Sequence, residues 1–224
     1  MKGVKSLRPI SHRYVAQWDP QAVLDFLKGG LYVPARSIKL ELLAKKTLML
    51  ILLASVNRVE IATALCISKD KMSHENSVIK FHVERADLKQ GSRVKEKPKP
   101  IKIKAFEQKS IDPVHYIVTY IERTKKMRGD IPQLFITSKG PVKPIARNTA
   151  KRWVREVMSQ SGINTDEFGP GSVRGASSSK GSSSGASLEE ILGAGGWSSA
   201  SVWQKNYNRP ILERKRSMTE IYFK

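Results

Sequence analysis

Cysteine is almost absent from the chain, since Cys66 is the only one among 224 residues. A single cysteine excludes an internal disulfide and a zinc site built from cysteines. A chain without disulfides is typical of a reducing intracellular compartment. We expect Cys66 to be a small core residue.

Sequence signals for several other protein classes are also missing. The longest apolar run, residues 48–56, is well short of the roughly 20 residues that a membrane-spanning helix requires, and no apolar secretory signal opens the chain. There is no glycine-rich phosphate loop and no His-Glu-x-x-His motif. The acidic residues show no spacing that would gather carboxylates around Mg²⁺, which argues against a two-metal nuclease.

Acidic residues are scarce beside basic ones: 20 Asp and Glu against 40 Lys and Arg give a formal net charge of +20. Such an excess favours a partner with many negative charges, most simply a nucleic acid. One basic cluster alone could be a solvated face, but four clusters with so few acids favour phosphate binding. They cover residues 93–104, 123–129, 151–155 and 213–216.

The apolar periodicity predicts one mainly α domain with a small antiparallel β-sheet, an α+β fold. Asp-Pro pairs at residues 19–20 and 112–113 mark helix starts, and Ser187 with Glu190 fits a capping box. The expected helices cover residues 19–30, 35–55, 57–65, 112–127, 145–162, 188–192 and 198–207. The expected strands cover residues 77–83, 100–106 and 133–138.

Residues 171–187 read GSVRGASSSKGSSSGAS, a composition that is typical of a flexible linker. The segment nevertheless contains Arg174 and leads directly into the capped helix at Ser187. Phosphodiester chemistry without metal ions requires cations that hold the phosphate and a side-chain nucleophile. Arginines and a tyrosine could supply both, which raises the alternative that this segment belongs to an active site.

Five segments carry a resemblance to a known family: residues 8–27, 52–65, 134–154, 173–179 and 188–210. In the last, a Gly-Trp pair is followed at short range by Asn-Tyr before Arg-Pro. The chain resembles the tyrosine recombinases, most closely the phage-integrase-like recombinases of DIRS-type retroelements in animal genomes. This implies the recombinase catalytic core fold over residues 19–209, an N-terminal tail at 1–18 and a basic C-terminal tail at 210–224.

The resemblance also implies an active site. Arg58 and Arg174 match the two arginines that bind the scissile phosphate, and Trp197 matches the residue beside that phosphate. Lys89 matches the lysine that protonates the leaving 5′ oxygen, and Tyr207 matches the nucleophile. The implied reaction is DNA cleavage and rejoining through a 3′-phosphotyrosyl intermediate, without a metal ion or cofactor.

Alternatives remain at several of these positions. Lys95 or Lys97 could serve in place of Lys89, because lysines crowd that region. Tyr222 is a weaker rival for the nucleophile. Without the resemblance, Arg58 would be an arginine leaving a helix, Trp197 a core residue and Tyr207 a residue of a helix surface.

Double-stranded DNA is the expected partner, with a homo-oligomer on DNA, such as a synaptic tetramer, as a further expectation. In the helix at 145–162, apolar residues should share one face while basic residues lie mostly on the other. The nucleus is the expected compartment if the host is eukaryotic. The expected DNA-binding residues are Lys95, Lys97, Arg147, Lys151, Arg152 and Arg155.

The chain departs from the family pattern in ways that bear on activity. Gly171 stands where the family has a histidine that helps to remove the tyrosine proton. Ile61 stands where an acid is common, although Glu60 is adjacent. Glycines and serines weaken the helix after Arg174. We also expect the N-terminal helical domain that completes the family's clamp around DNA to be missing.

Three functional hypotheses follow. The first is an active recombinase catalytic domain, with activity impaired at Gly171. The second is a catalytically inactive DNA-binding remnant of a mobile-element recombinase. The third is a generic basic protein that binds RNA or chromatin, and it predicts no special geometry among Arg58, Arg174, Trp197 and Tyr207.

Overall fold

The computed structural model describes residues 14–84 and 99–212. Over these ranges the expected α+β class is confirmed: helices form most of the described chain, and three short strands form one antiparallel sheet. The α-helices are α1 (Pro20–Lys28), α2 (Leu40–Ser55), α3 (Pro113–Arg128), α4 (Arg147–Gln160), α5 (Val173–Ser183), α6 (Leu188–Gly195) and α7 (Ala200–Asn206). The 3₁₀ helices are η1 (Gly30–Tyr32), η2 (Val59–Thr63), η4 (Lys109–Ile111) and η5 (Pro170–Ser172).

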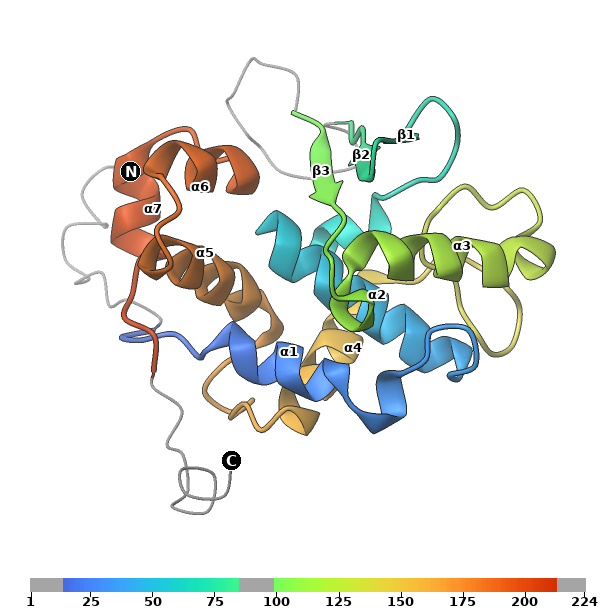
Figure 1. The fold of residues 1–224 in the computed structure, drawn as a ribbon, viewed down its shortest axis with the longest axis horizontal. Coiled ribbons are helices and arrows are strands. Elements are labelled where there is room, and N and C mark those ends of the chain that lie inside the picture. Colours follow the sequence, from blue (N-terminus) through green and yellow to red (C-terminus); the bar gives the residue numbers. More distant parts are fainter. Residues whose placement is uncertain (1–13, 85–98, 213–224) are drawn as a thin grey trace, which may run out of the picture.

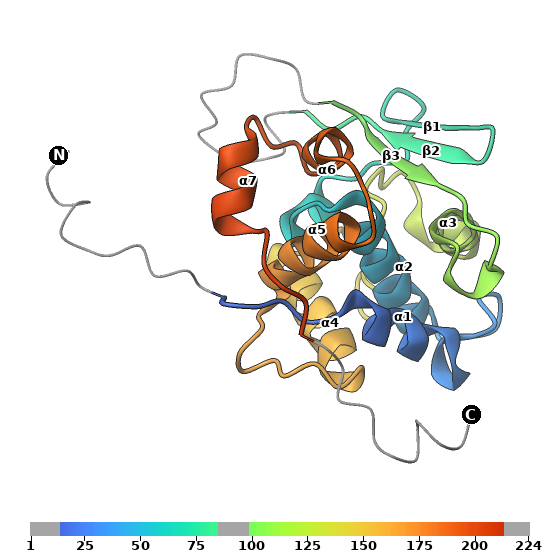
Figure 2. The same cartoon turned by 60° about the vertical axis from the view of Figure 1, so that its left-hand side comes forward.

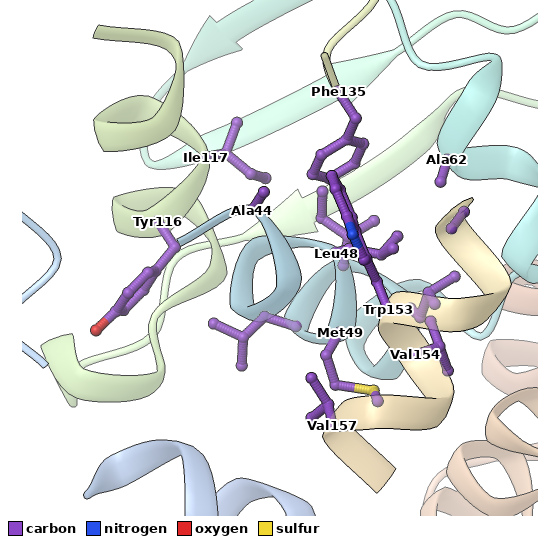
Figure 3. Packing of buried hydrophobic residues seen from close by; sticks show 14 of the residues in the cluster. Ala44, Leu48, Met49, Ala62, Tyr116, Ile117, Phe135, Trp153, Val154 and Val157 are labelled. Atoms are coloured by element: carbon purple, nitrogen blue, oxygen red, sulfur yellow. The ribbon is translucent and has the colours of Figure 1, made fainter. Parts of the chain in front are cut away.

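Helix α2 runs through the middle of the molecule, with α5, α6 and α7 on one side and α3 and the sheet on the other (Figure 1 and Figure 2). Every residue from Leu43 to Leu52 is buried, as expected for a helix that is covered on all sides. Around Leu48, the rings of Phe135 and Trp153 meet edge to face with their centroids 6.5 Å apart (Figure 3). The core therefore packs α4 against the middle of α2.

The sheet has the order β1 (Met72–Glu75), β2 (Val78–Phe81) and β3 (Ile101–Lys104). In register, Phe81 of β2 lies opposite Met72 of β1 and Ile101 of β3. Alternation sends Ile79, Phe81 and Ile103 into the core, while Lys102 and Lys104 face outward.

Several sequence signals for helix boundaries are confirmed. The Asp19 carboxylate accepts a hydrogen bond from the backbone N–H of Gln21 (3.0 Å) at the start of α1. Asp112 does the same for Val114 at α3 (3.0 Å), and Ser187 with Glu190 forms the capping box of α6. Each signal acts within a few residues, so no tertiary contact was required to predict it.

The helix predicted to begin near Ala35 begins at Leu40 instead. The preceding residues form a turn in which the N–H of Ile38 donates to the Pro34 carbonyl (3.3 Å). Arg123 then donates through Nη1 to the carbonyls of Ala35 (2.9 Å) and Ile38 (2.7 Å). These carbonyls serve a distant arginine, which sequence periodicity does not reveal.

The prediction of a strand at 133–138 is wrong. This stretch makes two isolated bridges, Gln133 with Cys66 and Ile136 with Pro144, and the N–H of Ile136 donates to the Tyr120 hydroxyl (3.2 Å). Cys66 is half-buried at this bridge rather than in the core.

Two further regions differ from expectation. Residues 57–65 hold only the short η2 helix. Strand β1 was not predicted, because its half-buried and exposed residues show no apolar alternation. In the described ranges, no helix combines the length and apolar character needed to cross a membrane.

Lys46 is fully buried in α2. Its Nζ donates to the carbonyls of Leu27 (2.6 Å) and Tyr32 (3.1 Å) and to the Tyr116 hydroxyl (2.7 Å). Burial lowers the pKa of Lys46 to about 7. The three oxygen acceptors favour the ammonium and offset part of that effect.

We expect the free energy of unfolding to rise as the pH increases from about 7 towards 10. In this window Lys46 carries a proton in the unfolded chain but not in the folded chain. Folding therefore requires loss of this proton, which costs less free energy as the pH rises. Since one pKa unit corresponds to about 1.4 kcal/mol, a folded pKa near 7 corresponds to a gain of up to about 4 kcal/mol across this window. Urea unfolding across this pH range should show it in the wild type but not in Lys46→Met. Parallel pH profiles of the two proteins would contradict the assignment.

Candidate active site

Three of the predicted site residues, from three separate segments, lie together. Arg174 is in the first turn of α5, Trp197 follows α6, and Tyr207 follows the last residue of α7. The Arg174 Cζ lies 4.1 Å from the centroid of the Trp197 ring and 5.2 Å from that of the Tyr207 ring. The two rings meet edge to face, 4.9 Å apart and inclined at 63°. One guanidinium therefore contacts both aromatic rings.

The end of α6 makes this arrangement possible. Gly195 has no side chain, and a Cβ there would lie 1.9 Å from Cζ3 of Trp197, so the indole ring occupies that space. Gly196 then takes a left-handed conformation with φ of 66°. The Gly195 carbonyl accepts a hydrogen bond from Nη2 of Arg174 (2.8 Å). The two glycines thus hold Trp197 and Arg174 against each other.

Arg174 is a buried cation without a carboxylate partner among the described residues. Its exposed fraction is 7%, and among the described residues no carboxylate lies within ion-pair distance. Its Nε makes no hydrogen bond within the part of the chain that the structure describes. A buried, incompletely bonded charge is costly, so this arrangement favours an anion that would complete it.

The electrostatic environment connects Arg174 with two other predicted residues. Burial lowers the pKa of Arg174 to about 10; Tyr207 opposes this shift, and the positive charge of Arg58 adds to it. Arg58 is exposed and directly precedes η2, after the end of α2. The positive charges of Arg58 and Arg174 therefore lie close enough to repel each other.

The acidic side chain that lies two residues after Arg58 also contacts α4. Glu60 forms an ion pair with Lys151 of α4, with Nζ and Oε1 2.8 Å apart. Ile61, at the position where the family pattern has an acid, is buried in the core. Glu60 thus links η2 to α4 through an ion pair.

Gly171 lies in η5, three residues before Arg174, and is exposed. A Cβ at this position would meet no atom within 4 Å, and its φ lies outside the left-handed region. Neither packing nor backbone conformation therefore requires glycine here. The first atom of a larger side chain would therefore displace no neighbour at this exposed position.

Other predicted residues fall elsewhere. Lys89, Lys95, Lys97 and Tyr222 lie outside the described residues. The histidines with described positions do not join α5: His74 and His82 lie in and after the β1–β2 hairpin, and His115 of α3 contacts Tyr116 edge to face.

Helix α4 has the two faces expected of it. Its apolar residues are buried, while Lys151, Arg152 and Arg155 are exposed and Arg147 is half-buried at its first turn. Some of these cations also have partners in the protein: Arg152 Nε lies 3.7 Å from a Glu156 oxygen, and Arg155 donates to the Thr165 carbonyl (2.9 Å).

Sequence reasoning missed the residues that hold the Tyr207 segment. Ser179 of α5 and Arg209 both bond to the backbone around Tyr207 and Asn208. Gln17 pairs through its backbone with Pro210 and Leu212. Only Arg209 had a signal, its place in the Asn-Tyr-x-Arg-Pro stretch; Ser179 is one serine among many.

The fold is similar to those of solved recombinases. XerA recombinase matches with a TM-score of 0.62 and 17% identity over 96% of this chain. XerH site-specific recombinase, in a pre-cleavage complex bound to its difH substrate, matches with a TM-score of 0.59 and 14% identity over 85% of this chain. A lambda integrase dimer bound to a COC′ core site matches with a TM-score of 0.55 and 13% identity over 97% of this chain.

The match covers only part of those proteins: 65% of the XerA chain, 49% of XerH and 55% of lambda integrase. No family model and no curated protein matches the sequence. The chain therefore has the catalytic-core fold of these recombinases, mainly helical with a small antiparallel sheet.

Proposed function

We propose that the chain is the catalytic domain of a tyrosine recombinase of mobile-element origin, related to those of DIRS-type retroelements. It would cleave and rejoin duplex DNA through a 3′-phosphotyrosyl intermediate at Tyr207. The observation that carries this proposal is the buried Arg174, which contacts both Trp197 and Tyr207 and leaves its Nε without a partner among the described residues. A phosphodiester oxygen could accept hydrogen bonds that the Arg174 guanidinium donates.

In the proposed reaction, the Tyr207 hydroxyl gives its proton to water, since Gly171 supplies no base, and its oxygen attacks the scissile phosphorus to form the new P–O bond. The bond to the 5′ oxygen breaks, and that oxygen leaves as a hydroxyl after it gains a proton, the task expected of Lys89. Arg58 and Arg174 stabilise the negative charge that develops on the non-bridging oxygens. Because the phosphotyrosyl link conserves the bond energy, a 5′ hydroxyl can reverse the step on another strand without ATP.

Several observations support DNA as the partner. The net charge is +20, and α4 exposes three basic side chains next to η2, the helix that directly follows Arg58. The XerH and lambda integrase structures with this fold are complexes with DNA. We extend the proposal to assembly of several copies on DNA, and to the nucleus if the host is eukaryotic.

A second candidate is a DNA-binding domain without catalysis. Gly171 favours it, because a glycine cannot accept the proton of the Tyr207 hydroxyl. Arg174 would then bind a phosphate that is never cleaved. The two candidates differ in one observable, a covalent bond between protein and DNA.

The experiment uses a pool of duplexes that are nicked beside a randomised sequence, so the target sequence need not be known in advance. Cleavage near the nick releases a short fragment that carries the 5′ hydroxyl. Once this fragment diffuses away, the strand cannot be rejoined, and the protein stays covalently bound to the DNA. We expect a covalent band on a denaturing gel with the wild type. Protein that binds the pool but forms no band, even as Gly171→His, would contradict recombinase activity and favour the second candidate.

Gly171→His should raise the initial rate of covalent trapping by about tenfold or more. A positioned acid–base group contributes about 10²–10⁴ in rate, and a histidine added without an orienting partner should recover only part of that. The open space around Gly171 predicts a normally folded variant. Gly171→Ala is the matched control and should leave the rate unchanged. Equal rates for the two variants would show that this position does not limit the reaction.

A further inference from the structure

The Ser179 side chain bonds to the backbone on both sides of Asn208, the residue that follows Tyr207. Its Oγ donates a hydrogen bond to the Tyr207 carbonyl (2.7 Å) and accepts one from the Arg209 N–H (3.1 Å). The side chain is buried, with an exposed fraction of 2%. One hydroxyl thus satisfies an acceptor and a donor of the backbone on either side of Asn208.

The segment after Tyr207 has further attachments to the body of the fold. The Arg209 guanidinium donates through Nε to the Tyr14 carbonyl (3.2 Å) and through Nη1 to the Gln204 carbonyl (3.2 Å), near the end of α7. Gln17 accepts from the Leu212 N–H (2.6 Å) and donates to the Pro210 carbonyl (2.9 Å). Among these contacts, that of Ser179 acts directly on the peptide unit of Tyr207.

Ser179 belongs to the same helix as Arg174. Because α5 is a continuous helix, it holds the phosphate-binding guanidinium and the backbone of Tyr207 at a fixed separation. Cleavage requires the attacking oxygen to lie close to the phosphorus and in line with the leaving oxygen, and displacement by about 1 Å can cost on the order of 10² in rate. The main-chain position of Tyr207 therefore matters as much as its hydroxyl.

We propose that Ser179 is the positioning residue of the nucleophile: through its two hydrogen bonds to the backbone of Tyr207 and Arg209, it sets the Tyr207 hydroxyl relative to Arg174. This inference rests on the proposed function. Ser179 touches no substrate and acts only through Tyr207.

The neighbouring Ser178 provides a matched control. It is equally buried, with an exposed fraction of 1%, but its Oγ donates to the Gly175 carbonyl of its own helix (3.2 Å). Ser178→Ala and Ser179→Ala therefore remove the same group from the same helix, and only the second change releases the Tyr207 segment.

The test compares wild type, Ser178→Ala and Ser179→Ala in three measurements: the rate of covalent trapping at saturating nicked DNA, the affinity for DNA, and amide hydrogen exchange at Arg209. For Ser179→Ala we expect an approximately 10-fold to 100-fold slower rate, unchanged affinity and faster exchange at Arg209. Ser178→Ala should match the wild type in all three. If Ser179→Ala does not fold, Ser179→Cys preserves the shape with a weaker donor and should show a smaller loss of the same kind.

Wild-type rates and exchange in Ser179→Ala would overturn the proposal, as would equal losses in both variants. If the wild type forms no covalent complex, the proposed function fails, and the exchange measurement decides the positioning claim alone. Faster exchange at Arg209 only in Ser179→Ala would then support Ser179 as the anchor of this segment, and unchanged exchange would refute it.

Discussion

Replacing Tyr207 by phenylalanine should abolish covalent attachment to DNA. The substitution removes the attacking oxygen and keeps the ring, so the contacts with Trp197 and Arg174 remain. Because those contacts are made by the ring, the fold and the affinity for DNA should change little. The expected loss is complete, since no other atom of this side chain can form the phosphoester bond.

The measurement is the covalent band on the nicked duplex pool, with DNA affinity measured in parallel. Tyr222→Phe is the matched control and should leave the band unchanged. A band that persists in Tyr207→Phe but disappears in Tyr222→Phe would show that Tyr222, and not Tyr207, is the nucleophile.

Replacing Arg174 by lysine should slow covalent trapping by about 10²–10³, the usual cost of removing one group that stabilises transition-state charge. Lysine retains a charge but lacks the planar fork that can bind two phosphate oxygens while it stacks on Trp197. In this buried position, desolvation would also lower the pKa of the lysine and favour its neutral form. The free energy of unfolding should fall little, because Arg174 makes only one hydrogen bond to the described residues.

Arg128 is the matched control for this substitution. It is also a buried helical arginine, with an exposed fraction of 5%, but it donates to the Thr124 hydroxyl and to the carbonyls of Gln133 and Leu134. Arg128→Lys should therefore lower stability and leave the trapping rate of the folded protein unchanged. If Arg174→Lys instead destabilises the protein as much as Arg128→Lys and cleaves DNA normally, Arg174 has a structural role.

The sequence alone predicted the features that depend on neighbouring residues. The Asp19 and Asp112 caps, the Ser187–Glu190 box and the two faces of α4 each follow from residues within one or two turns. Features set by distant contacts could not be predicted in this way. The late start of α2 depends on Arg123, and the path of residues 133–138 depends on a tyrosine of α3.

The serine-rich segment at 171–187 shows the same division. Its composition indicates a linker, yet residues 173–183 form α5, with Ser178 and Ser179 buried. Burial is favourable there because the hydroxyls bond to backbone groups, Ser179 to a segment 28 residues away. Composition cannot reveal such a partner, so the role of Ser179 required the structure. The grouping of Arg174, Trp197 and Tyr207 was expected only from the resemblance to the tyrosine recombinases.

The folded unit also extends past the boundaries expected for the catalytic core. Trp18 donates through Nε1 to the Ser172 hydroxyl (2.8 Å), close to Arg174, and Gln17 pairs with the segment after Tyr207. Residues 14–18 thus connect the two halves of the candidate site. Variants that remove them should be judged as site variants and not as loss of a tail.

The most direct test of the account is the identity of the residue that becomes linked to DNA. The covalent complex would be digested with nuclease and trypsin, and the modified peptide sequenced by mass spectrometry. We expect a 3′-phosphonucleotide on Tyr207, in the tryptic peptide that begins at Asn206 after Lys205. A nucleotide on any other residue, or a complex on DNA without a covalent nucleotide, would contradict it.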